Sequence, residues 1–117
     1  MNKSYLLEER TAVFGESIIL FCKQIAPSSI TSSLVNQLVR SATSIGANYM
    51  EANGACSKSD FRNKIYICKK EAMETKHWLR MLSAGLPEKR EQLREFWREA
   101  QELTLIFSKI ASSSKNK

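Results

Sequence analysis

Apolar residues recur in this chain at alternating spacings of four and three residues. The longest unbroken run lies between residues 59 and 84 and comprises Phe61, Ile65, Cys68, Ala72, Thr75, Leu79 and Leu82. Such spacing places one apolar stripe along a helix, near the 3.5-residue period of bundle packing. The same pattern over residues 5–25, 32–53 and 88–111 predicts four helices in all, and no segment shows the alternation typical of a strand.

Turn residues separate the four stretches. Pro27 ends the first, Asn53-Gly54 ends the second, and Gly85-Leu86-Pro87 joins the third to the fourth. Because short connections make sequential helices antiparallel neighbours, these breaks predict an all-α, up-down-up-down antiparallel four-helix bundle. We expect one bundle domain over residues 1–111, followed by a polar, flexible tail over residues 112–117.

Composition sets the broad class of protein. A chain of 117 residues suffices for one core, and its 43% hydrophobic and 26% charged residues are ordinary for a globular domain. No run of about 18 apolar residues exists, and charge comes too early at the N-terminus for a signal peptide. Three cysteines without a CxxC pair suit a disulfide framework poorly. We therefore expect a cytoplasmic protein with no membrane partner.

The net charge of +6 is concentrated on the third predicted helix. Residues 57–85 carry seven basic and three acidic residues, whereas residues 1–56 carry four of each. At about 100° per residue, five basic side chains project within roughly 40° of one direction. These are Lys58, Arg62, Lys69, Lys76 and Arg80, with no acid among them.

This basic stripe has two interpretations. A charged helix face is usually only solvated, or it pairs with a neighbouring subunit. Such a face normally mixes signs and thereby gains i,i+4 pairing, which the basic stripe forgoes. Contact with the phosphate backbone of RNA or DNA is therefore the functional hypothesis. The fourth helix, where Arg90, Arg94 and Arg98 alternate with glutamates, shows the pattern of an ordinary exposed, salt-bridged helix.

Two further faces are not explained by a single core stripe. One is polar, lies on the second helix within roughly 80°, and comprises Gln37, Arg40, Ser44, Asn48 and Glu51. The other lies on the third helix and comprises Ile67, Glu71, Glu74 and Trp78. A bundle core buries one stripe per helix, so we expect these residues to be a subunit interface or buried polar contacts.

Catalytic and metal chemistry find little support. Glu74-Thr75-Lys76-His77 matches the Glu-x-x-His motif of di-iron bundles, but that site needs the motif from two helices, and His77 is the only histidine. The lone histidine also excludes most acid–base designs. We predict no catalytic residues, no metal ligands and no cofactor, and therefore a protein that is not an enzyme.

The segment Leu38 to Asn48 resembles a family of bacterial four-helix-bundle proteins, often encoded by intervening sequences in 23S ribosomal RNA genes. Further points of resemblance are Glu51, Asp60-Phe61, Lys70-Glu71-Ala72, Glu74 and Trp78-Leu79. One departure is Ala52, where the family often has glycine directly after the glutamate. By position, Arg40, Ser44, Asn48, Glu51, Glu71, Glu74 and Trp78 match the family as structural or interface residues.

The resemblance implies a bundle that assembles as a ring-shaped homo-oligomer, a homopentamer. A related branch, the accessory proteins of diversity-generating retroelements, is similar to a basic pentamer that binds nucleic acid and a reverse transcriptase. The function expected for this chain is therefore nonspecific binding of RNA or DNA through the basic stripe. The alternative is a protein-interaction scaffold without nucleic-acid binding, in which the stripe pairs with an acidic partner or a neighbouring subunit.

Overall fold

Four long helices account for most of the chain in the computed structural model, which describes the backbone of residues 3–115 and the side chains of residues 6–114. They are α1 (Lys3–Cys22), α2 (Ser29–Asn53), α3 (Lys58–Gly85) and α4 (Arg90–Lys115), with a short 3-10 helix η1 (Pro87–Lys89) before α4. No strand occurs among the described residues. The all-α class and the four helices predicted from sequence are confirmed.

The helix ends follow from local chemistry. The Ser28 and Ser57 hydroxyls accept hydrogen bonds of 3.0 Å from the amides of Thr31 and Asp60, which caps the first turns of α2 and α3. Pro87 begins η1, because proline lacks the amide hydrogen that a helix interior needs. The largest difference from prediction is at the end of α4. The helix continues to Lys115, so most of the tail expected at 112–117 is helical, and residues 116–117 lie outside the described region.

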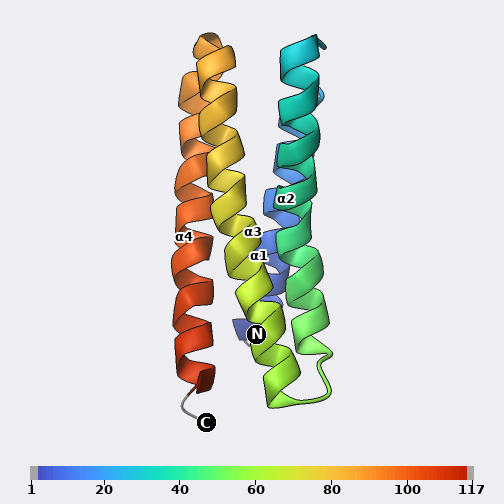
Figure 1. Ribbon diagram of the computed structural model, residues 1–117, viewed down its shortest axis with the longest axis vertical. Helices are drawn as coiled ribbons and strands as arrows, with labels where there is room; N and C mark the ends of the chain where they lie inside the picture. The colour runs from blue at the N-terminus through green and yellow to red at the C-terminus, as the bar shows by residue number, and fades with distance from the viewer. Residues whose placement is uncertain (1–2, 116–117) are drawn as a thin grey trace.

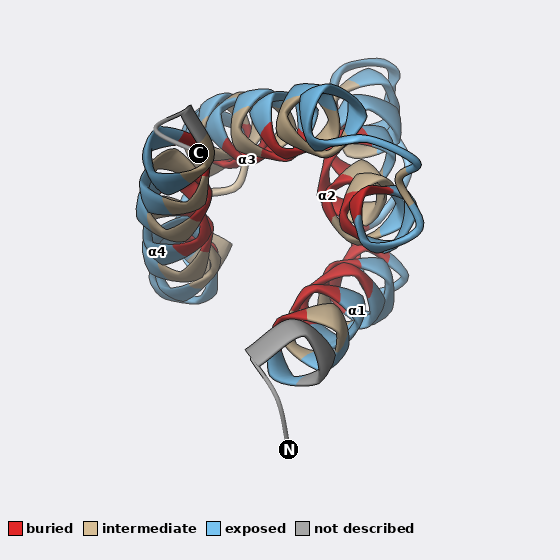
Figure 2. Ribbon diagram, turned by 90° about the horizontal axis from the view of Figure 1, so that it is seen from below, coloured by how far each residue is buried: buried red, intermediate tan, exposed pale blue. Residues whose placement is uncertain are grey.

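The helices lie side by side in chain order and alternate in direction, forming a rod about 47 Å long and 22 Å wide (Figure 1). The closest backbone approaches join α1 to α2, α2 to α3 and α3 to α4. Viewed along the rod, the four helices form an open arc whose buried residues face inward (Figure 2). The expected bundle arrangement agrees with this order.

Side chains close the arc between α1 and α4. Phe96 of α4 packs edge-on against Phe14 and Phe21 of α1, with ring centroids 6.3 and 5.3 Å apart. Arg10 donates two hydrogen bonds of 2.7 Å to the Glu99 carboxylate. The α1–α4 contact therefore depends on long side chains rather than on close backbone packing.

The core follows the predicted apolar stripes. The largest fully buried side chains include Ile18, Leu38, Ile45, Ile65, Leu79, Leu103 and Phe107. Buried hydroxyls are hydrogen-bonded: Thr75 Oγ1 shares its hydrogen between Ser41 Oγ of α2 at 2.9 Å and the Glu71 carbonyl one turn back at 2.8 Å. No described side-chain nitrogen or oxygen is buried without a hydrogen-bond partner. No helix of the described chain is both long and apolar enough to cross a membrane.

Candidate nucleic-acid interface

The basic stripe lies on the side of α3 that borders α4. Lys76 Nζ donates a 2.5 Å hydrogen bond to Gln101 Oε1 of α4 and lies 5.4 Å from the ring centroid of Trp97. Lys69, Lys76 and Arg62 are half-buried, whereas Arg80 and Lys58 are exposed. The stripe is therefore one wall of the α3–α4 contact, and Lys76 already has partners within the chain.

Two arginines of α4 extend this basic surface. Arg90 and Arg94 line a cleft together with Arg80, and the other lining residues are Leu79, Ser83, Leu93 and Trp97. Among the residues that the structure describes, no acid lines this cleft. Together, the side chains of Lys69, Lys76, Arg80, Arg90 and Arg94 form what we call the cationic seam. Within the part of the chain whose side chains are described, no ion pair reaches any of them.

Sequence reasoning missed Arg90 and Arg94. It interpreted the alternation of arginine and glutamate on α4 as an exposed, salt-bridged helix. The three arginines are exposed, but no ion pair reaches them among the described residues, so the salt-bridge part was wrong. Two of the glutamates pair across the bundle: Arg10 of α1 contacts Glu99 at 2.7 Å and Glu102 at 3.6 Å. The rotation of about 100° per residue could have identified them in the sequence, because it places Arg90 and Arg94 on the same side of α4 as Trp97.

Four of the residues predicted as interface or buried polar contacts form ion pairs between α2 and α3. Arg40 forms a salt bridge of 3.3 Å to Glu71 and a second one to Glu74. Lys64 pairs with Glu51 at 2.7 Å. We call these five residues the paired seam. Its charges alternate in sign across two helices and are satisfied inside one chain.

The remaining members of that predicted set support the paired seam or lie beside it. Gln37 accepts a 3.2 Å hydrogen bond from Arg40, and the Trp78 indole donates one of 3.4 Å to Glu74. Ser44 and Asn48 donate to carbonyls one turn back along α2, at 2.7 and 2.8 Å. Ile67 alone of the set is apolar and exposed, at 37%. A role for this set in contacts between subunits stays a prediction.

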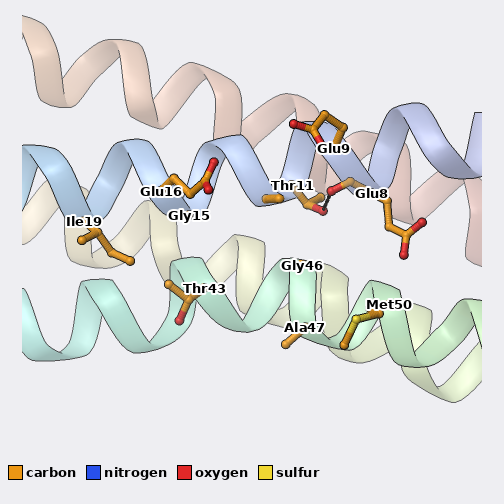
Figure 3. A pocket seen from close by; sticks show the side chains of 11 residues that line it. Glu8, Glu9, Thr11, Gly15, Glu16, Ile19, Thr43, Gly46, Ala47 and Met50 are labelled. Carbon is orange, nitrogen blue, oxygen red and sulfur yellow. Dashed lines mark hydrogen bonds between the residues drawn. The ribbon is translucent and has the colours of Figure 1, made fainter.

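A different surface, between α1 and α2, combines small apolar residues with acids. Gly15, Gly46 and Ala47 allow the two helices to approach closely, and Glu8, Glu9 and Glu16 project from α1 around the resulting groove (Figure 3). The groove has a volume of about 460 Å³ and also includes Thr11, Ala12, Ile19, Thr43 and Met50. Its acidic character is opposite to that of the cationic seam.

Thiol and imidazole groups do not assemble into a reactive site. Burial raises the pKa of Cys22 to about 11 and that of Cys68 to about 12, so both thiols stay protonated at neutral pH. Cys56 is exposed in the turn between α2 and α3. His77 is exposed and packs edge-on against Trp78, with ring centroids 4.9 Å apart. Among the described residues, no three His, Cys, Asp or Glu side chains are grouped as metal ligands would be.

The fold and its two seams define the class: a basic, all-α four-helix bundle with one paired and one unpaired charged surface. Residues 7–111 match the family of 23S rRNA-intervening sequence proteins, and the chain belongs to this family. The resemblance noted in the sequence is thereby confirmed.

Similarity to a solved structure supports the same assignment. The chain is similar to the crystal structure of a protein of unknown function from the S23 ribosomal protein family of Bacteroides thetaiotaomicron, with a TM-score of 0.86 and 32% sequence identity. The similarity covers 95% of this chain and 99% of that chain. No curated protein matches the sequence significantly.

Proposed function

We propose that the protein is a non-enzymatic, self-associating helical bundle that binds RNA or DNA without sequence preference through the basic side of α3. The observation that carries this proposal concerns the described residues: no acid lines the α3–α4 cleft, and no ion pair forms at the cationic seam. Like charges held together without counter-charges repel one another, and a phosphate backbone relieves that repulsion.

The basic stripe gives this interface its length. Lys58 and Arg80 are 22 residues apart on α3, which corresponds to about 33 Å along a helix. Half-buried Lys69 and Arg62 lie between them, so a backbone running along α3 would meet cations throughout. Contacts of this kind position a nucleic acid without reading its bases, which is why the proposal is nonspecific binding.

Charge reversal tests the proposal directly. The double variant Lys69→Glu/Arg80→Glu should weaken binding to a short RNA at least about tenfold at low salt, because it removes two cations and adds two anions at the interface. Lys23→Glu/Lys109→Glu makes the same change in net charge away from the seam and should leave the affinity within about threefold. If the unaltered protein binds neither RNA nor DNA at about 50 mM salt, the proposal is wrong.

Self-association is the second part of the proposal, and α1 supports it. Leu6, Val13 and Leu20 recur every seven residues on α1 and are 52%, 47% and 61% exposed. An exposed apolar stripe of this kind usually marks a contact with another chain. In the homopentameric ring that the family resemblance implies, such a contact is head-to-tail and closes on itself.

Light scattering of the purified protein measures the mass of the particle in solution and so tests self-association. We expect the mass of an oligomer for the unaltered chain and a smaller mass for Val13→Glu/Leu20→Glu. Leu105→Glu, which alters an exposed leucine of α4, is the matched control and should keep the oligomer. A monomer in the unaltered protein would rule out the ring.

The acidic groove favours one alternative, a protein-interaction scaffold without nucleic-acid binding. Glu8, Glu9 and Glu16 of one subunit could face the cationic seam of the next, or an acidic partner protein could occupy the seam. A reverse transcriptase is the kind of partner that the family resemblance implies. Under this alternative, Lys69→Glu/Arg80→Glu would lower the oligomer mass or abolish partner binding. RNA would bind neither the unaltered protein nor the variant.

A further inference from the structure

The α3–α4 cleft at one end of the cationic seam combines arginines, a tryptophan and buried leucines, a composition that a merely solvated surface does not require. Arg80 and Ser83 come from the last two turns of α3, and Arg90, Arg94 and Trp97 come from the first two turns of α4. Leu79 and Leu93 form its floor and are 1% exposed each. The volume is about 340 Å³, within the range of small-ligand sites.

The electrostatics of this cleft favour an anion. Among the described residues, three arginines and no acid line the cleft, and none of the three arginines has an ion pair. Arg90 is also the first residue of α4, where the helix dipole already presents a positive end. Guanidinium forks match phosphate oxygens two at a time, which an ammonium group cannot do.

Trp97 adds a flat aromatic surface to the same cleft. The residue is 38% exposed although it lies beside a core-facing phenylalanine, Phe96. The Lys76 ammonium lies over the indole ring, 5.4 Å from its centroid, in a cation–π contact. An exposed indole surrounded by arginines is the arrangement on which single-stranded nucleic acids stack their bases while cations hold the backbone.

We propose that this cleft binds an unpaired nucleotide of a single-stranded RNA or DNA, with the base against Trp97 and the flanking phosphates on Arg80, Arg90 and Arg94. The inference rests on the proposed nucleic-acid binding and specifies its substrate class. A duplex keeps its base faces stacked inside the helix and can offer only phosphates and groove edges to this surface. The stripe along α3 is open to either form, whereas the Trp97 cleft selects the single strand.

The test compares single-stranded and duplex oligonucleotides of one sequence, measured by fluorescence anisotropy at about 50 mM salt. Trp97→Ala should weaken single-strand binding about tenfold and change duplex binding less than about twofold. Trp97→Phe keeps an aromatic face and should recover most of the single-strand affinity. Leu105→Ala, at a 58% exposed position of α4 outside the cleft, is the matched control.

A second measurement reports on the indole itself. In a Trp78→Phe background, Trp97 is the only tryptophan, and stacking with a base should quench its fluorescence as a single strand is titrated in. Thermal melting of each variant establishes that it is folded before binding is compared.

The outcomes separate this inference from the proposed function. If Lys69→Glu/Arg80→Glu lowers binding but Trp97→Ala binds single strands as tightly as the unaltered protein, the cleft inference fails and the proposed function stands. Equal losses for single strand and duplex in Trp97→Ala would also overturn it. If no oligonucleotide binds at all, both fail together.

Discussion

The two sides of α3 carry similar numbers of charged residues and use them in opposite ways. On the side of α2, the paired seam joins Arg40 to Glu71 and Glu74 and joins Lys64 to Glu51. On the side of α4, the cationic seam holds five cations with no ion pair among the described residues. The paired seam stabilises the chain that contains it. The cationic seam gains no stabilisation from ion pairs among the described residues, and only Lys76 is engaged within the chain, so the other four charges are available to a partner.

The largest expected difference between the seams is in the salt dependence of nucleic-acid binding. With about five phosphates neutralised on a single strand, affinity should fall roughly 100-fold between 50 and 200 mM salt. Arg80→Ala/Arg94→Ala should make the log–log slope shallower by about 1.4, because two phosphate contacts are lost. Arg40→Ala removes a cation from the paired seam and should leave the slope unchanged. Equal slopes for all three proteins would mean that the cationic seam does not contact phosphate.

The second prediction concerns stability. Arg40→Ala should lower the free energy of unfolding by about 1–2 kcal/mol, measured by urea denaturation. The reason is that Glu71, whose side chain is only 12% exposed, and Glu74 lose their shared cation. The expected loss is modest because the Arg40 side chain is itself 46% exposed, so water screens its ion pairs. Arg98→Ala on α4, with no ion pair to lose among the described residues, serves as control, and an equal loss there would contradict the role of the seam.

The helices and their inward faces could be predicted from the spacing of apolar residues alone. The same angular argument correctly placed the five cations of α3 on one side, because rotation per residue is a property of a single helix. It could not say which neighbouring helix that side would meet. That depends on how two helices are rotated against each other, and their contacts link residues far apart in the chain.

The paired seam illustrates this limit. Arg40 and Glu71 are 31 residues apart and meet only because α2 and α3 pack antiparallel. From sequence, both were expected to be interface or buried polar residues, but their pairing within one chain was not foreseen. Arg90 and Arg94 were missed for a related reason. The glutamates interspersed with the arginines of α4 suggested pairing along the helix, whereas two of them, Glu99 and Glu102, pair with Arg10 across the bundle.

The third prediction concerns pH and a thiol beneath the paired seam. Cys68 donates a hydrogen bond of 3.6 Å to the Ile45 carbonyl of α2, and burial raises its pKa from 9.0 to about 12. The unfolded chain ionises this thiol above about pH 9 and the folded chain does not. The contribution to stability is therefore complete below pH 9 and is lost as pH rises toward 12, amounting to about 1 kcal/mol by pH 10.

Urea denaturation at pH 8 and pH 10 measures this effect. The loss of stability between the two pH values should be smaller in Cys68→Ala than in the unaltered protein. Cys56→Ala removes an exposed thiol and should show the unaltered loss. Lys64, whose pKa is raised by its hydrogen bond to Glu51, titrates in all three proteins and cancels from the comparison. An identical loss in Cys68→Ala would show that the thiol is already solvated in the folded chain.

The smallest expected effect has the opposite sign from that of Arg40→Ala. Arg90→Gln should raise the free energy of unfolding of the ligand-free protein by about 0.3–1 kcal/mol, because it removes a cation from the positive end of α4 and from beside Arg80 and Arg94. Arg98→Gln, further along α4, should change stability by less than about 0.5 kcal/mol. The gain in Arg90→Gln should disappear in about 1 M salt, where charges more than roughly 3 Å apart are screened. If Arg90→Gln instead lowers stability, Arg90 stabilises the folded chain. The cationic seam would then resemble the paired seam at this end of the bundle.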